Sequence, residues 1–198
     1  MEADLSIEKQ YSNYVIAGVD EVGRGAWAGP VVVSAVIIDQ TKCFYGIADS
    51  KSLSAAKRLE LSHKIKNDHL YGIGSADPHE IDLLNINNAI KLAIERAIAE
   101  LPIKPDLILL DGNYSFDLSV KKINVIKGDA KSISIAAASI IAKQYRDNLM
   151  VSLSNEFPAF MWDKNVGYGT LVHRQALTTN GITKHHRLSY TPIRSLLL

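Results

Sequence analysis

The chain has 198 residues, of which 47% are hydrophobic and 22% are charged, and its formal net charge is +1. This composition is that of an ordinary folded protein that can bury a sizeable core. The near-zero net charge excludes a global positive field, so a binding site for a polyanion must be a local patch.

Hydrophobic periodicity predicts strands and helices that alternate along the chain. In chain order, the predicted elements are strands at residues 15–20 and 30–38, a helix at 53–67, a strand at 70–75, a helix at 81–101, strands at 107–110 and 123–126, and helices at 132–155 and 170–179. Pro102 ends the second helix and Gly181 ends the last. This order predicts an α/β fold, with a mixed sheet flanked by helices and a helical tail.

Three features bear on the compartment. Residues 1–14 lack the basic and then apolar pattern of a signal peptide. The longest apolar runs, such as residues 135–142, are too short to cross a bilayer. The single cysteine, Cys43, cannot form an internal disulfide, which agrees with a reducing compartment. We therefore expect a cytoplasmic protein with no membrane segment.

Acidic residues interrupt the apolar strands. Asp20 and Glu21 close the first strand, Asp111 closes the fourth, and Asp129 follows the fifth. A buried carboxylate costs several kcal/mol unless it is paired or binds a metal. Such strand ends meet at one edge of a sheet, where α/β folds bind ligands. Oxygen ligands without His or Cys favour Mg²⁺ or Mn²⁺, and two such ions suit in-line attack on a phosphodiester.

Each acid taken alone has a simpler explanation in turn or helix capping. Asp111 begins an Asp-Gly-Asn turn sequence, and Asp129 stands where it could cap the following helix. The set as a whole favours a common metal-binding role. Residue spacing alone does not say which phosphoester enzyme this is.

The segment at residues 20–25 (DEVGRG) is the most specific part of the chain. Gly23 and Gly25 let the backbone turn sharply and approach a ligand, and Arg24 supplies charge. Backbone N–H groups in such a turn can bind an anion. The alternative is a strand-to-strand turn with a surface arginine.

Here the sequence resembles the bacterial type of ribonuclease HII, the type 2 ribonuclease H. Further matches to this family follow in order at residues 49–51 (DSK), 78–82 (PHEID), 85–86 (NI), 111–113 (DGN), 127–129 (KGD), 137–143 (AASIIAK), 146–147 (RD), 167–170 (GYGT) and 185–187 (HHR). The resemblance covers the chain from about residue 16 to the C-terminus. A glycine loop alone would be weak support, but several motifs in order are strong.

The resemblance implies a site and a reaction. Asp20, Glu21, Asp111 and Asp129 would be the catalytic, metal-binding acids, with Mn²⁺ or Mg²⁺ as cofactor. Main-chain groups of Gly23, Arg24 and Gly25 would grip the ribose 2′-hydroxyl, and Tyr168 would pack against the sugar where RNA meets DNA. The substrates implied are RNA–DNA hybrids and DNA containing ribonucleotides. Cleavage would fall on the 5′ side of a ribonucleotide and leave 3′-hydroxyl and 5′-phosphate ends.

The fold implied is the ribonuclease H-like mixed five-stranded sheet with a C-terminal helical extension. We expect an N-terminal segment (residues 1–14), a catalytic core (15–157) and a helical extension (158–198) that contributes to substrate binding. The chain is expected to act as a monomer. Its apolar C-terminus could dock on a partner such as a sliding clamp, through Ile193, Leu196, Leu197 and Leu198.

Two departures from the family pattern stand out. Val166 occupies a position before Gly167 where many members have a basic residue, and residues 132–135 lack an acid often seen there. Ribonuclease HIII is the near alternative, but it carries an added N-terminal domain and lacks the arginine that Arg24 provides here. A non-catalytic hybrid-binding protein is a second alternative. Four carboxylates would only repel phosphates in such a protein, which argues against it.

Several residues outside the acids and the glycine loop allow more than one interpretation. Lys51 could neutralise a phosphate or be a solvated surface residue. Lys143 and Arg146 could face nucleic acid or form the exposed side of a helix. His185 and His186 suggest zinc at first sight, but no Cys or third correctly spaced ligand accompanies them, which favours a basic patch near the RNA–DNA groove or a structural role. His79 and Glu80 are expected to organise a loop. Trp27 and Trp162 could stack on bases or be partly buried anchors, and the second role is the commoner one.

Overall fold

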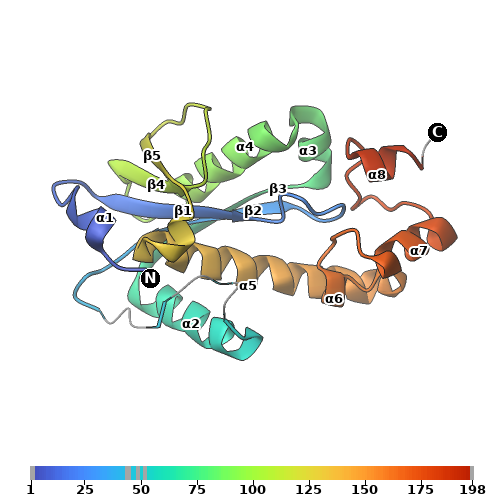
Figure 1. Ribbon diagram of the computed structural model, residues 1–198, viewed down its shortest axis with the longest axis horizontal. Helices are drawn as coiled ribbons and strands as arrows, with labels where there is room; N and C mark the ends of the chain where they lie inside the picture. The colour runs from blue at the N-terminus through green and yellow to red at the C-terminus, as the bar shows by residue number, and fades with distance from the viewer. Residues whose placement is uncertain (1–2, 43–45, 48–49, 51–52, 197–198) are drawn as a thin grey trace.

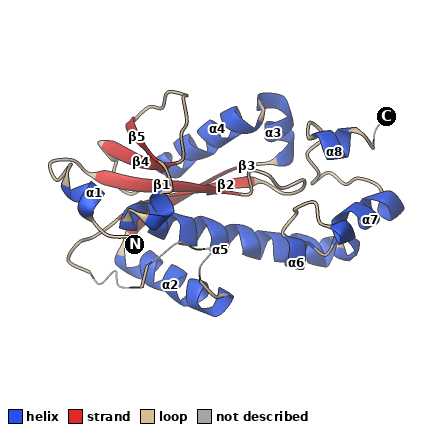
Figure 2. Cartoon of the chain, in the orientation of Figure 1, coloured by secondary structure: helices blue, strands red, loops and turns tan. Residues whose placement is uncertain are grey.

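A five-stranded mixed sheet forms the centre of the molecule (Figures 1 and 2). The computed structural model describes residues 3–42, 46–47, 50 and 53–196. The strands are β1 (Ile16–Val22), β2 (Val31–Ile37), β3 (Leu70–Ala76), β4 (Leu107–Asp111) and β5 (Lys121–Val125), in the spatial order β3-β2-β1-β4-β5. The pairs β3-β2 and β2-β1 are antiparallel, whereas β1-β4 and β4-β5 are parallel. The predicted fold class is therefore confirmed.

Helices cover both faces of this sheet (Figure 1). On one face α4 (Ile86–Ala99) packs its apolar side on alternate residues of the central strands, such as Ala17 and Val19 of β1. On the other face lies α5 (Ile133–Glu156), which in turn supports α2 (Ala55–Asp68). Successive residues of a strand point to opposite faces. Each strand that is covered on both sides is therefore a continuous apolar run, as its sequence indicated.

The single helix predicted at residues 81–101 is wrong. The structure has two helices there, α3 (Pro78–Leu84) and α4, which meet at Asn85. Asn85 adopts φ +64°, and its side chain accepts hydrogen bonds from the backbone N–H groups of Asn87 and Asn88. These side-chain bonds cap the start of α4, so a new helix begins here without glycine or proline at the break.

The N-terminal segment packs on the start of α5. It contains a short helix, α1 (Ser6–Lys9), whose buried Glu8 accepts hydrogen bonds from the hydroxyls of Ser132 and Ser134 and from the Ser134 N–H. Asp4 pairs with Ser132 through a parallel bridge. These contacts fix the chain immediately after the short 3-10 helix η1 (Gly128–Ala130), which carries Asp129.

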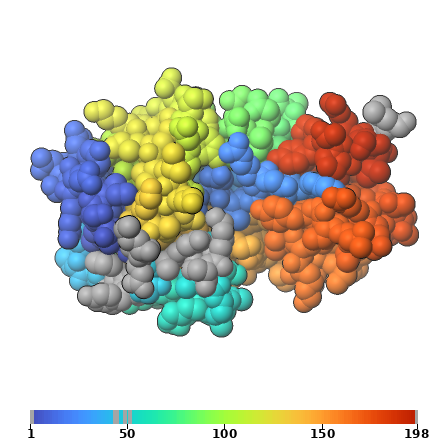
Figure 3. All heavy atoms as spheres, in the orientation of Figure 1, coloured from blue at the N-terminus to red at the C-terminus, as the bar shows by residue number. Residues whose placement is uncertain are grey.

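The C-terminal extension lies at the opposite end of the molecule from α1 (Figures 1 and 3). It consists of η2 (Pro158–Phe160), α6 (Trp162–Asn165), α7 (Leu171–Asn180) and α8 (Thr191–Arg194). Its own apolar cluster is built around the fully buried Trp162 and includes Ile193. Trp162 is thus an anchor, as expected. Ile193 belongs to the core and not to a free apolar C-terminus.

Candidate active site

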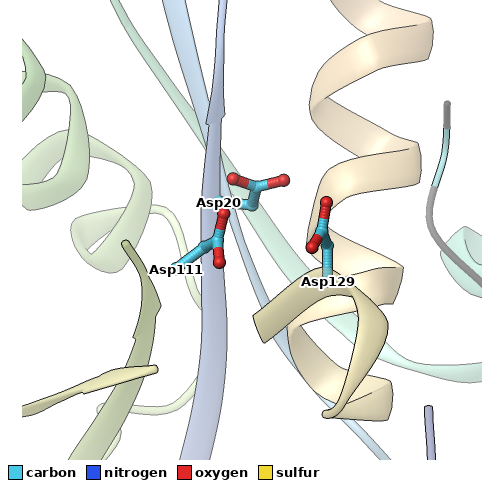
Figure 4. A group of neighbouring side chains, drawn as sticks. All are labelled: Asp20, Asp111 and Asp129. Atoms are coloured by element: carbon cyan, nitrogen blue, oxygen red, sulfur yellow. The ribbon is translucent and has the colours of Figure 1, made fainter. Parts of the chain in front are cut away.

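Three of the four predicted acids converge at one edge of the sheet (Figure 4). Asp20 comes from β1, Asp111 from the end of β4, and Asp129 from η1 beyond β5. One carboxylate oxygen from each lies within 4.8 Å of the others. The parallel pairing of β4 with both β1 and β5 brings these strand ends together. The cluster offers oxygen ligands alone, which fits a hard divalent cation.

The surroundings of the cluster oppose negative charge. Asp20 and Asp129 are both buried, at 6% and 7% exposure. Burial, and then the nearby carboxylates of Glu21 and Asp111, raise the pKa of Asp20 well above its usual value. Asp111 is held in place by the Gly128 N–H, which donates to its Oδ1 at 2.6 Å. A cation bound among these oxygens would relieve the repulsion that the folded chain imposes.

Glu21 lies on the other face of the sheet from Asp20. Gly18 of β1 touches α5, so Asp20, two residues on, faces α5, whereas Glu21 faces α4 with Val19. Its carboxylate accepts a 2.7 Å hydrogen bond from the Tyr114 hydroxyl, which in turn accepts one from Arg24. Burial raises the pKa of Glu21, and the bond from Tyr114 acts against that rise. Its predicted role as a fourth metal ligand stays a prediction.

Tyr114 is a site residue that the sequence interpretation missed. It follows the Asp-Gly-Asn turn by one position and is 6% exposed. Burial, together with the charge of Glu21, raises the pKa of its hydroxyl above the usual value, so it stays a donor to that carboxylate. The only sequence signal was an aromatic residue three positions after Asp111.

The predicted glycine loop rests on two buried arginines. Arg146 donates to the carbonyl oxygens of Pro30, Ala28 and Val166, and Arg187 donates to those of Gly29 and Arg24. Both side chains are fully buried. Burial, and then the charge of Arg187, lower the pKa of Arg146 to about 10, so it stays charged at neutral pH. Arg146 is therefore neither on an exposed helix side nor facing nucleic acid.

A pocket of about 250 Å³ opens beside the acids. Asp20, Glu21 and Val22 line one side, Ser139 and Lys143 of α5 another, and Ser50 and Tyr168 complete it. The Lys143 ammonium is oriented by Asp147 at 2.8 Å. Lys51, predicted to contact substrate, lies outside the described residues. The structure thus places Tyr168 and Lys143 beside the acid cluster, although they are distant from it in sequence.

The histidines near the C-terminus belong to the core of the extension. His186 is buried and hydrogen-bonded to His173, and His185 stacks edge-on against Phe157. Within the described residues, the candidate metal group is the acid cluster, and it contains no histidine. Glu80 is structural as expected, since it closes a capping box with Asp77 and pairs with Arg96.

Comparisons with known proteins agree with this site. The family model described as ribonuclease HII matches residues 17–193. A ribonuclease HII from Rickettsia bellii is 50% identical over 96% of this chain and 97% of its own. Among solved structures, ribonuclease H2 from Pyrococcus horikoshii has a TM-score of 0.79 and 28% identity, over 91% of this chain and 96% of its own. The ribonuclease HII in a PCNA complex from Archaeoglobus fulgidus has a TM-score of 0.76 and 26% identity, over 89% and 95%.

The mixed five-stranded sheet and the carboxylate cluster define the class of protein, a metal-dependent nuclease with the ribonuclease H fold. The family match extends through the glycine loop, the acids and the C-terminal extension. The chain belongs to the ribonuclease HII family. Among the described residues, no helix is long and apolar enough to span a membrane.

Proposed function

We propose that this protein hydrolyses the RNA strand of RNA–DNA hybrids and incises on the 5′ side of ribonucleotides embedded in duplex DNA. The products would carry 3′-hydroxyl and 5′-phosphate ends, and two Mn²⁺ or Mg²⁺ ions would serve as cofactors. The observation that supports this most is the acid cluster opening on a pocket that Tyr168 also lines. A phosphodiester at the acids therefore lies within reach of a residue suited to contact a sugar.

In this proposal the site residues have different roles in binding cations, phosphate and sugar. Asp20, Asp111 and Asp129 would hold the cations, with Glu21 as a further ligand from the opposite face. Bound cations supply Lewis-acid stabilisation to the charge that develops on the phosphate oxygens. Lys143, oriented by Asp147, presents its ammonium to the same pocket. The backbone at Gly23, Arg24 and Gly25 would contact the 2′-hydroxyl, the chemical mark that separates a ribonucleotide from its DNA neighbours.

The proposal predicts a selective effect of Tyr168→Ala. Tyr168 is 38% exposed, and its ring lies over the Arg146 guanidinium at 5.9 Å from the ring centroid. We expect incision at a single ribonucleotide in DNA to fall about tenfold more than cleavage of an all-RNA strand in a hybrid, because positioning errors near 1 Å have effects of this size or larger. The measurement is the ratio of the two kcat/KM values.

Tyr14→Ala is the matched control for this ratio. Tyr14 is 45% exposed and lies outside the region that the family model matches. Its removal should leave the ratio unchanged. An unchanged ratio in Tyr168→Ala would mean that the tyrosine does not sense the junction. Cleavage of a hybrid with Mn²⁺ but not with a chelator separates an enzyme from a hybrid-binding protein.

Cation binding should stabilise the protein in a pH-dependent way. The raised pKa of Asp20 means that the folded chain keeps a proton that the unfolded chain loses as pH rises above the usual value of 3.8. The metal-free protein therefore loses stability as pH rises towards the folded pKa, and a cation restores it there. Mn²⁺ at about 100 times its Kd adds ~2.7 kcal/mol. That is about 5–10 °C in Tm for a chain of this size.

The check is the Tm with and without Mn²⁺ at two pH values. We expect a clearly larger increase near pH 8 than near pH 5, where protons compete for the carboxylates. Asp129→Asn should abolish most of the increase. Equal increases at both pH values, or in the variant, would contradict cation binding by these acids.

We further propose that the extension at residues 158–198 contributes to substrate binding, since it supplies Tyr168 and Arg187. A clamp contact through the C-terminus is also proposed, because the Archaeoglobus fulgidus relative is in complex with PCNA. Leu196 is 51% exposed and could take part, whereas Leu197 and Leu198 lie outside the described residues. We also propose that the protein acts in the cytoplasm as a monomer.

A further inference from the structure

Two histidines form a buried hydrogen-bonded pair behind Tyr168. His173 of α7 and His186 of the following loop are 0% and 2% exposed, and their Nε2 atoms are 3.0 Å apart. In such a contact one ring nitrogen must carry the hydrogen and donate the hydrogen bond, and the other must accept it. The direction of this hydrogen bond is therefore set by the other hydrogen-bond partners of each ring.

Two groups that can only donate fix this direction. The backbone N–H of Thr183 points to His186 Nδ1 at 2.9 Å, so that nitrogen is an acceptor and the proton of His186 is on Nε2. The indole N–H of Trp162 points to His173 Nε2 at 3.3 Å, so that nitrogen also accepts. His186 Nε2–H therefore donates to His173 Nε2.

The proton of His173 must then be on Nδ1. This nitrogen lies 3.0 Å from the carbonyl oxygen of Tyr168, to which it donates. The hydrogen bonds thus run in one direction, from the Thr183 N–H through both rings to Tyr168. Protonation of either ring would set two donors against each other, so both rings must be neutral.

The surroundings keep both rings neutral. Burial lowers the pKa of His173, and burial together with the charges of His173 and His185 lowers the pKa of His186 to about 4. Lys184 and Glu156 face His185 rather than the pair. The same arrangement of protons should therefore persist throughout the neutral range.

The pair also joins the two segments that would contact substrate. His186 forms an antiparallel bridge with Ala28, in the segment that follows the glycine loop. Its neighbour Arg187 donates to the Arg24 carbonyl. On the other side, His173 reaches Tyr168, which faces the acids across the pocket. The hydrogen bonds of Arg187, His186 and His173, joined by the main chain between Arg187 and His186, thus connect the loop to the tyrosine.

We propose that His173 and His186 are positioning residues that hold the backbone of Tyr168 at a fixed distance from the glycine loop, through the His173 Nδ1–H bond to its carbonyl. This inference rests on the proposed function, in which Tyr168 recognises the sugar at the RNA–DNA junction. Neither histidine contacts the reacting atoms. Both act through the place they give to Tyr168.

The first test reads the protons directly and needs no activity. Nitrogen-15 NMR of the imidazole rings in the full-length protein near pH 7 distinguishes the two neutral tautomers and the charged form. We expect the Nδ1–H form for His173 and the Nε2–H form for His186. A protonated ring, or the opposite tautomer in either ring, overturns the proposal.

The second test compares two replacements of His173. In His173→Asn the amide nitrogen can occupy the Nδ1 position and still donate to Tyr168. In His173→Gln the amide can reach the Nε2 position and accept from His186, but the donor to Tyr168 is lost. We expect His173→Gln to lower the ratio of single-ribonucleotide incision to hybrid cleavage about fivefold, the order expected for one lost hydrogen bond. His173→Asn should keep most of the ratio.

Two controls separate positioning from packing. Thermal unfolding shows whether both variants are destabilised alike. The double variant His173→Gln/Tyr168→Ala should show no lower ratio than Tyr168→Ala alone, because the histidine acts through the tyrosine. Equal ratios in the Gln and Asn variants, or additive losses in the double variant, overturn the proposal.

A failure of the proposed function would look different. The ratio would then be unchanged in Tyr168→Ala as well as in His173→Gln, although the NMR tautomers are as expected. That outcome overturns the functional part of this inference together with the junction role of Tyr168.

Discussion

Asp20→Asn is expected to lower hydrolysis of an RNA–DNA hybrid by about 10³-fold while the fold is retained. The amide keeps the shape of the carboxylate but loses the charge that would hold a cation. Burial and neighbouring acids already penalise the charge at Asp20, so its removal should stabilise the metal-free protein and not destabilise it. Hybrid binding should persist or tighten, because repulsion of the phosphates falls.

The measurements are steady-state cleavage of a labelled hybrid in Mn²⁺ and equilibrium binding of the same hybrid in a chelator. Asp117→Asn is the matched control, since Asp117 is exposed and lies outside the acid cluster. It should cleave like the parent protein. Near-parental turnover by Asp20→Asn, with contaminating metal excluded, would remove Asp20 from the catalytic set.

Gly23→Ala should damage both stability and every cleavage activity. Gly23 adopts φ +89°, and a Cβ atom there would lie 2.2 Å from Nε of Arg146. Arg146 cannot move aside easily, because its guanidinium holds three backbone carbonyls. The left-handed conformation costs about 1–2 kcal/mol and the displaced arginine about 1–3 more. Hybrid cleavage and ribonucleotide incision should both fall, because the loop is pushed away from the sugar.

Gly25→Ala is the matched control for the loss of stability expected in Gly23→Ala. Its added Cβ would have the Tyr168 ring as nearest neighbour at 3.8 Å, which is ordinary van der Waals contact. Urea unfolding should therefore show a loss below about 1 kcal/mol, as is usual for a surface substitution without strain. A Gly23→Ala protein as stable as Gly25→Ala would contradict the tight packing of the loop on Arg146.

The five strands and the helices α2, α5 and α7 could be predicted from the sequence to within two residues. The helix predicted at residues 132–155, for example, spans Ile133–Glu156, and the strand predicted at 30–38 spans Val31–Ile37. Long apolar or periodic runs carry such signals because they reflect local burial. The break at Asn85 escaped because asparagine is an unremarkable helix residue until its side chain caps a new start. Three four-residue helices, α1, α6 and α8, were also missed.

The site could be predicted in part. Charges that end apolar strands are visible in the sequence, and the family resemblance selected the same acids. Their convergence depends on the parallel pairing of β1, β4 and β5, and the β1–β4 pairing joins segments distant in sequence, such as Ile16 and Leu107. The alternation of a strand also separates Asp20 from Glu21, although they are neighbours in sequence.

The sequence by itself determined the fold class and the family, and it predicted the four acids, because apolar periodicity and charges in apolar strands are local features. Only the tertiary structure decided which polar residues in the second half of the chain are buried. From the sequence alone Arg146 could be an exposed residue and His186 a zinc ligand, yet both are buried polar residues of the protein interior. Their partners, the Pro30 carbonyl and His173, come from other segments. Burial of a polar group is favourable only when such partners arrive, and folding alone supplies them.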